Sequence, residues 1–359
     1  MVSFLIPSGS IFAVPSFAAR TELVSLIENV TAASAKRYRA TDNRGHVLDC
    51  IKVIANPYVH GQFIGVYHTM AGDGKIRVNL AVSTNLMDWT WVKELAGSGT
   101  DNGAAMPTIK HSPDGGFVLA WEQNNFDPHI KISYYSNWND LELDHPSEMF
   151  SCPRTLSKCA EGTPNIYYAC SNYVELGFHY FSNCDVDRQA RGALNFRTRR
   201  WITTKETTLD KAVLALGYSA NIGDRDGYIR FKGSDFGLIE GQKVKNDFST
   251  FRCFIYDPVT KNAELLNMHT DGNSTAFSNP TITRVNINGR SAIFVSMFIF
   301  AGHDPLGPLI YYRLIDCDQG TNSVRSTPKN ASSVCCERYK GNSEISTIAD
   351  IENTESKEK

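Results

Sequence analysis

Acidic side chains recur in this sequence at or just before short apolar runs. Asp101, Glu161, Asp224 and Asp226 occupy such places, and Glu122 lies inside a run of this kind. Carboxylates brought together at one site repel one another, which raises the pKa of at least one of them. A carboxylic acid with a raised pKa beside an ordinary carboxylate is the pair needed to cleave a glycosidic bond, as proton donor and as base or nucleophile. Taken singly, each acid is also typical of a turn or a strand end.

Four segments of the chain open in the same way. In each of them, a small or polar residue is followed by Pro and then by a strand-like run. A fifth opening, Ala220 to Asp224, has the same character but lacks the Pro. The openings are spaced by about fifty to sixty residues, a period that is typical of propeller blades. The four dipeptides are Asn56-Pro57, Met106-Pro107, Thr163-Pro164 and Asn279-Pro280.

Each opening is followed by about four short strand patterns separated by turns. The pattern predicts an all-β fold, a five-bladed β-propeller with a helical N-terminal segment. Two β-sandwiches are the alternative, but they would need a linker near the middle, where the sequence has no boundary rich in Pro, Gly and Ser. The strand patterns of the five repeats lie within 56–92, 106–141, 163–201, 228–268 and 280–314.

The ends of the chain differ from the repeats. Residues 1–19 are largely apolar and end in small residues that would allow signal peptidase to cleave after Ala18, but Pro interrupts them and no basic residue precedes them. Residues 20–45 show helical spacing of apolar side chains and form the expected N-terminal helical segment. We assign 46–340 to the propeller and expect 341–359, rich in Ser, Glu, Lys and Asn, to be a disordered tail.

The charge balance narrows the range of partners. The 359 residues include 36 basic and 38 acidic ones, for a net charge of −2. Because no field of one sign is available, we expect neither a nucleic acid nor a membrane partner. We also expect a monomer. No apolar run is long enough to span a bilayer.

The nine cysteines do not have the C-x-x-C spacing of zinc or redox sites. The cluster from Cys152 to Cys184 is compatible with one or two disulfides, and Cys335-Cys336 with another. Buried free thiols in a cytosolic protein are the alternative. Three N-glycosylation sequons, together with the apolar N-terminus, favour a secreted, disulfide-containing glycoprotein. The sequons begin at Asn29, Asn273 and Asn330.

Over roughly residues 50 to 315 the blade plan resembles the five-bladed propeller glycosidases. This group includes the arabinanases, β-xylosidases and arabinofuranosidases of family 43 and, more distantly, the invertases and levansucrases. Three features carry the resemblance: the Asn56-Pro57 opening before a Tyr-rich strand, the segment from Leu80 to Trp89, and Glu161-Gly162-Thr163-Pro164. The second is similar to the family's A-x-S-x-D-L-x-x-W segment, and the third to its E-G-P segment.

The resemblance implies hydrolysis of arabinose-, xylose- or fructose-type glycosides in an oligo- or polysaccharide. Glu161 matches the position of the general acid. The position of the base, an Asp before the first-blade Pro, is occupied by Asn56, and an amide cannot accept the proton. The base would then be Asp101, Asp224 or Asp226, or the blade register differs, or ordinary hydrolysis is lost. Asp224 is also the best match to the third family acid, with Arg225 available to pair with a carboxylate.

Further side chains near strand ends are candidates for substrate binding. Trp121, Glu122 and His179 join Asn56, Arg225 and Asp226 in this role, although core or rim positions are the alternative for the aromatic and His side chains. The His residues are too scattered to predict a metal site, and no cofactor is indicated. Some relatives hold a calcium in the axial channel, which leaves a structural calcium open. A propeller that binds carbohydrate or protein without catalysis is the second hypothesis, favoured by Asn56.

Overall fold

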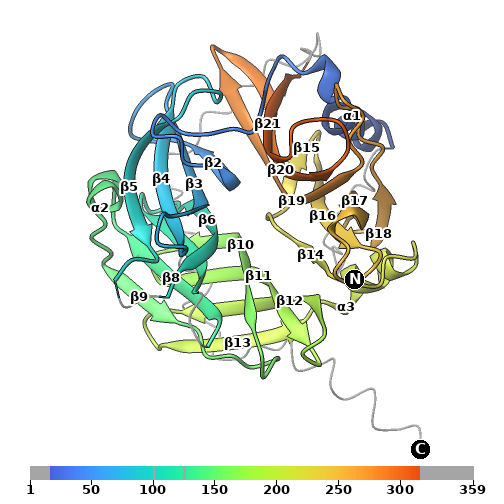
Figure 1. Ribbon diagram of the computed structural model, residues 1–359. Helices are drawn as coiled ribbons and strands as arrows, with labels where there is room; N and C mark the ends of the chain where they lie inside the picture. Colours follow the sequence, from blue (N-terminus) through green and yellow to red (C-terminus); the bar gives the residue numbers. More distant parts are fainter. Residues whose placement is uncertain (1–16, 100–101, 124–126, 316–359) are drawn as a thin grey trace, which may run out of the picture.

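The computed structural model describes residues 17–99, 102–123 and 127–315. Five antiparallel sheets stand around a common axis like the blades of a propeller (Figure 1). The predicted all-β, five-bladed propeller with a helix at the N-terminus is therefore confirmed.

Consecutive strands of each blade pair side by side, from the innermost strand outward. Blade 1 contains β2 (Asp49–Ala55), β3 (Phe63–Met70), β4 (Ile76–Ser83) and β5 (Thr90–Ala96). Blade 2 contains β6 (Ala104–His111), β7 (Phe117–Gln123), β8 (His129–Tyr135) and β9 (Glu148–Ser151). Blade 3 contains β10 (Glu161–Cys170), β11 (Tyr173–Ser182), β12 (Val186–Asn195) and β13 (Arg200–Lys205). Blade 4 contains β14 (Ile222–Asp224), β16 (Ser234–Gln242), β17 (Phe251–Asp257) and β18 (Asn262–Leu265), with β15 (Ile229–Phe231) paired to β16.

The N-terminal part of the chain completes the last blade. Blade 5 contains β19 (Ala276–Ile287), β20 (Arg290–Ala301) and β21 (Gly307–Leu314), and its outermost strand is β1 (Ala35–Tyr38). Both ends of the propeller thus share one sheet, which closes the ring and leaves no unpaired edge on β21. The predicted boundary at residue 46 is wrong for this reason, because β1 already belongs to the propeller.

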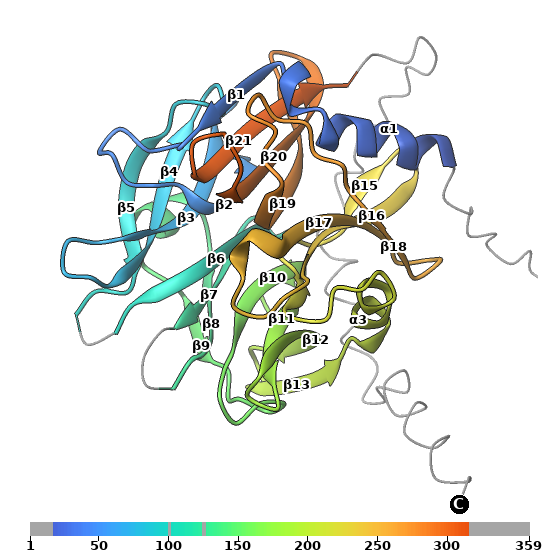
Figure 2. The ribbon, with the colours of Figure 1, turned by 45° about the vertical axis from the view of Figure 1, so that its right-hand side comes forward.

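Helices and short turns decorate the outside of the blades. Helix α1 (Phe17–Glu28) packs its apolar side chains onto blades 4 and 5, and Figure 2 shows it lying along that side of the molecule. It is shorter than the predicted helical segment 20–45, whose later part forms β1. The remaining elements are α2 (Trp138–Leu143), α3 (Thr207–Leu214) and the 3₁₀ turns η1 (Val30–Ala32) and η2 (Phe248–Thr250).

The hydrophobic core lies between neighbouring blades rather than at the axis. Blades 1 and 2 share one apolar cluster and blades 2 and 3 another, while blade 5 packs on blade 1 through a third. Helix α3 fills the joint between blades 3 and 4 by inserting Leu209 and Val213 against β14, β16 and β17. Because apolar contacts hold the blades together from the side, the axis is free to carry polar groups.

Four innermost strands contain the same irregularity near their start. The strand pairing shifts by a bulge there. One non-glycine residue at each bulge has a positive φ, a conformation that L-residues rarely adopt. These residues are Cys50 (55°), Met106 (52°), Thr163 (51°) and Asn279 (51°).

This irregularity corrects the predicted start of blade 1. Pro follows the positive-φ residue in three blades, but Ile51 follows it in blade 1. The Asn56-Pro57 opening instead comes after β2, at the opposite end of that strand. There the Asn56 side chain bonds to Gln62 and accepts from the backbone of Tyr58, so it holds the β2–β3 turn.

The cysteines divide between one disulfide and several thiols. Cys159 and Cys184 form a disulfide with a Cα–Cα distance of 5.6 Å, so one bridge of the predicted cluster is confirmed. The other cysteines among the described residues are buried free thiols: Cys50, Cys152, Cys170 and Cys253. Cys317, Cys335 and Cys336 lie outside the described residues, as do residues 1–16 of the predicted signal peptide and the predicted tail. In the described part of the chain, no helix has the length and apolar character needed to cross a bilayer.

The disulfide should contribute measurably to stability because it joins the loop before β10 to the turn between β11 and β12. A bridge that closes 25 residues restricts the unfolded chain by about 3 kcal/mol. We expect the Cys159→Ser/Cys184→Ser variant to melt several degrees below the native protein by scanning calorimetry. Reductant should lower the Tm of the native protein toward that of the variant and leave the variant unchanged. An equal Tm for both proteins would contradict the assignment.

Candidate functional site

The innermost strands all begin at the same end of the axis, and one register position is shared by all five blades. On the inner strands this position holds mostly small residues: Asp49, Ala105, Gly162, Gly223 and Ser278. The residues paired to them on the second strands are large: His68, Glu122, His179, Glu240 and Phe298. We call this set of ten residues the axial ring. Four of its five large members are titratable.

The large members of the axial ring bind across the joints between blades. The backbone N–H of Met106 in blade 2 donates to His68 Nδ1 in blade 1, over 3.3 Å. The N–H of Thr163 in blade 3 donates in the same way to Glu122 Oε2 in blade 2, over 3.1 Å.

The pattern continues around the axis. Glu240 of blade 4 accepts from the N–H of Asn279 in blade 5, and His179 Nε2 of blade 3 lies 2.9 Å from the carbonyl oxygen of Asp224 in blade 4. Each joint from blade 1 to blade 5 is therefore bonded at the axial ring by the side chain of the preceding blade.

Arg225 lies at the centre of this arrangement. Its positive charge acts on the pKa of Asp49, Glu122, His179 and Glu240, which come from four different blades. The side chain is almost fully buried, and no guanidinium nitrogen has a hydrogen-bond partner among the described residues. Arg225 thus acts on the carboxylates through its charge rather than through direct bonds.

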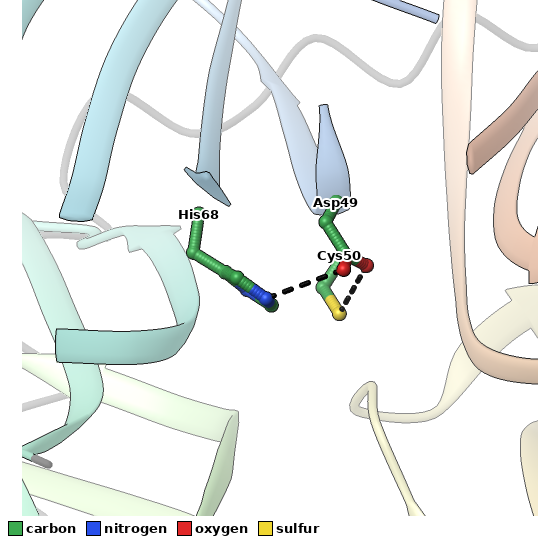
Figure 3. A group of neighbouring side chains, drawn as sticks. All are labelled: Asp49, Cys50 and His68. Atoms are coloured by element: carbon green, nitrogen blue, oxygen red, sulfur yellow. Dashed lines mark hydrogen bonds and ion pairs between the residues drawn. The ribbon is translucent and has the colours of Figure 1, made fainter. Parts of the chain in front are cut away.

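Asp49 is the acidic member of blade 1, and two neighbouring side chains orient it (Figure 3). His68 Nε2 lies 3.3 Å from Asp49 Oδ2, and the Cys50 thiol donates to Asp49 Oδ1 over 3.1 Å. Because Nδ1 of His68 accepts the Met106 amide, the neutral imidazole carries its proton on Nε2 and donates it to Asp49. Burial alone would raise the pKa of Asp49, but His68, Cys50 and Arg225 outweigh it and hold the pKa below its usual value.

Asp49, Cys50 and His68 also place three potential metal ligands within 4.8 Å of one another. Their chemistry does not fit calcium, which takes oxygen ligands. A ligating His normally donates its second ring nitrogen to an acceptor, whereas Nδ1 of His68 faces a donor. The nearby charge of Arg225 also disfavours a cation. Hydrogen bonding to an ionised Asp49 therefore accounts for this group better than metal ligation.

Three further carboxyl groups at this end of the axis have raised pKa values. Burial raises the pKa of Glu240 to about 7, against the Asn279 amide and the charge of Arg225. Burial also raises the pKa of Glu122, against the Thr163 amide. Asp187, near the start of β12, has its pKa raised to about 7 by burial and by the negative charge of Glu122. Since Asp187 also acts on Glu240, it lies within reach of both glutamates.

The other acids of blade 4 form a deeper polar layer. Asp224 accepts from the Tyr167 hydroxyl and from Gln189 Nε2, and burial raises its pKa to about 6. Asp226 forms an ion pair with Lys52 and accepts from the backbone N–H of Ile282 over 2.8 Å. That pair joins blades 1, 4 and 5 across the axis, so Asp226 is a structural element of the ring.

The structure gives Glu161 a place different from the predicted one. It precedes Gly162, so its side chain faces the side of the strand opposite the axial ring. There Oε1 accepts the backbone N–H groups of Thr155 (2.7 Å), Leu156 and Ser157 (3.0 Å). The carboxylate is buried and holds the loop between β9 and β10.

The remaining predicted residues divide between the axial ring and the scaffold. The structure brings together Glu122, His179, Asp224 and Arg225. It places Trp121 in the core between blades 1 and 2, with Nε1 bonded to Gln123, and Asn56 at the far end of β2. Asp101 lies outside the described residues.

Sequence reasoning missed Asp49, His68, Asp187 and Glu240. The signal for Asp49 is its place two residues before Ile51, as Gly162 stands two residues before Pro164, but the missing Pro concealed it. His68 and Glu240 become visible only when the second strands are aligned with Glu122 and His179. Asp187 stands outside the repeat and left no signal beyond a charged segment.

Comparisons with known proteins agree with this architecture. No family model and no curated protein matches the sequence. Among solved structures, a glycoside hydrolase superposes with a TM-score of 0.52 at 11% identity, over 88% of this chain and 99% of that one. A thermostable family-43 glycoside hydrolase superposes with 0.51 at 9% identity, over 78% and 93%.

A third structure, an exo-beta-1,3-galactanase from Clostridium thermocellum, superposes with a TM-score of 0.50 at 11% identity, over 82% of this chain and 63% of that one. Identities this low bear on the fold alone. The chain therefore has the five-bladed propeller fold of the family-43-type glycoside hydrolases, and the resemblance seen in its sequence is confirmed at the level of the fold.

Proposed function

We propose that this protein is a glycoside hydrolase whose base, Asp49, belongs to the axial ring and whose acid, Asp187, lies within electrostatic reach of Glu122 and Glu240 in that ring. The observation that carries the proposal is that the surroundings of two carboxyl groups shift their pKa values in opposite directions. The pKa of Asp49 lies below its usual value, whereas that of Asp187 is raised to about 7. Near pH 6 Asp49 is ionised while Asp187 keeps its proton, which is the division of roles that glycosidic cleavage needs.

The chemistry then follows from the two protonation states. Asp187 donates its proton to the glycosidic oxygen as the bond to the anomeric carbon breaks. Asp49 assists a water molecule, or attacks the anomeric carbon itself, depending on its separation from the acid. His68 and Cys50 are positioning residues, because their hydrogen bonds hold the Asp49 carboxylate in one orientation.

Arg225 and the glutamates support this pair electrostatically. The negative charge of Glu122 favours the protonated form of Asp187, and the positive charge of Arg225 favours the ionised form of Asp49. Both effects act in a largely buried site, where charges interact more strongly than in water. The predicted substrates, arabinose-, xylose- or fructose-type glycosides, remain the first to screen. The fold shared with a galactanase adds galactosides.

The acid can be tested by the quality of the leaving group. Asp187→Asn cannot protonate the departing oxygen, so hydrolysis of oligosaccharides and alkyl glycosides should fall by about 10²–10⁴-fold. Dinitrophenyl glycosides need little protonation and should lose far less. Asp49→Asn should abolish both reactions, because no base or nucleophile remains. Initial rates on matched glycoside pairs give the measurement.

Two control variants make this test specific. Asp185→Asn changes an exposed carboxylate two residues away and should leave both rates unchanged. Glu161→Gln should lower the Tm, since it removes the charge that three backbone amides share, without creating leaving-group dependence. If Glu122→Gln shows the dependence and Asp187→Asn does not, the proton donor is Glu122. If no glycoside in the panel is cleaved, the hydrolase proposal fails.

The pH dependence gives a second test. The value of kcat/KM should fall as the pH rises through about 7, because Asp187 loses its proton there. Arg225→Met should raise the pKa of Asp49 and so move the acidic limb of the profile to higher pH. Arg225→Lys retains the charge and should shift this limb less. Equal profiles for the three proteins would show that Arg225 does not tune the base.

A further inference from the structure

We propose that Phe298, Phe300 and Phe248 form a carbohydrate-binding platform that runs from the axial ring across the end of blade 5 toward blade 4. We call these three residues the phenylalanine row. The proposal rests on the proposed function, because it assigns the row to sugar residues beside the bond to be cleaved. It therefore predicts a substrate that is a chain of sugars rather than a single glycoside.

The row begins at Phe298, the member of the axial ring on the second strand of blade 5. Ser296, two residues before Phe298 on the same face of β20, lies against β2, where its Oγ donates to the Ile51 carbonyl over 2.9 Å. Phe298 thus occupies the joint between blades 5 and 1, as His68, Glu122, His179 and Glu240 occupy the other four.

Phe298 differs in chemistry from the other four large members of the axial ring. Each of those four side chains forms a hydrogen bond across the joint to the next blade, whereas a phenyl ring can neither donate nor accept one. The one joint without such a side chain is therefore the joint next to the proposed base. An apolar ring in an axial ring whose other large members are titratable matches a sugar, which has hydroxyl groups at its edge and C–H groups on its face.

The row then leads away from the axis without a break. The Phe298 and Phe300 ring centroids lie 4.7 Å apart, and those of Phe300 and Phe248 5.0 Å apart. Phe251, at the start of β17, supports the row from beneath, with its buried ring 6.1 Å from that of Phe300. Phe298 and Phe300 are partly buried, and Phe248 is 54% exposed.

Phe248 is exposed although both of its neighbours in the sequence are polar. It belongs to η2, in the connection between β16 and β17, and its neighbours Asp247 and Ser249 are polar and bonded to each other. Glu240 precedes the same connection, so the row and the axial ring lie at one end of the propeller. A hydrophobic ring held outward on a braced turn is suited to stacking on a ligand.

Binding measurements on a catalytically disabled protein test the row directly. In the Asp187→Asn background, we would titrate arabino-, xylo- and galacto-oligosaccharides, from disaccharide to hexasaccharide, by isothermal calorimetry. Affinity should rise with chain length for at least one series. Adding Phe248→Ala should weaken binding of the long members by about ten-fold and leave the disaccharide unchanged. Phe300→Ala should weaken both long and intermediate members.

Matched controls separate the possible results. Val259→Ala removes another exposed apolar side chain, in the turn between β17 and β18 at the opposite end of β17 from Phe251, and should leave every affinity unchanged. If long and short chains bind equally, or if Phe248→Ala and Phe300→Ala change nothing, the platform is refuted even when the native enzyme cleaves glycosides. If the native protein cleaves none but binding depends on the row and on chain length, the platform stands and the hydrolase proposal fails.

Discussion

The narrow space at the axis is the constraint on which the rest of this structure depends. Five strands begin there together, so four of the five inner positions carry Ala, Gly or Ser. A Cβ on Gly162 would overlap the Glu122 carboxylate, and one on Gly223 would overlap the His179 ring. Because the inner strands give up their side chains, the second strands supply most of the functional groups at the axial ring.

This crowding also decides how charge is distributed. Asp49, Glu122 and Glu240 surround Arg225, and the described residues leave its guanidinium without a hydrogen-bond partner. One cation cannot compensate all of the carboxylates, so their pKa values separate according to local partners. Asp49 has two donors and stays ionised, while burial and the negative charge of Glu122 raise the pKa of Asp187 to about 7. The acid and base roles that we propose follow from this difference in surroundings.

The sequence predicted the fold well and the site in part, for reasons that particular residues make clear. Pro after the positive-φ residue marks β6, β10 and β19, and this regularity was enough to find the blades. In blade 1 the bulge at Cys50 is followed by Ile51, so the pattern pointed instead to Asn56-Pro57, one strand length too late. Glu122 and His179 were found without knowing their register, whereas His68 and Glu240 required it.

Glu161 shows why a motif cannot assign a role without the register of its strand. Successive residues of a strand face opposite sides, so a shift of one residue separates a side chain in the axial ring from one behind the blade. Here Gly162 faces Glu122 of blade 2 within the axial ring, and the Glu161 carboxylate binds three amides of the preceding loop. A fold shared at 9–11% identity bears on the path of the strands and does not by itself fix this parity. In such propellers the acid and base have to be identified from hydrogen bonds and charges at the axis.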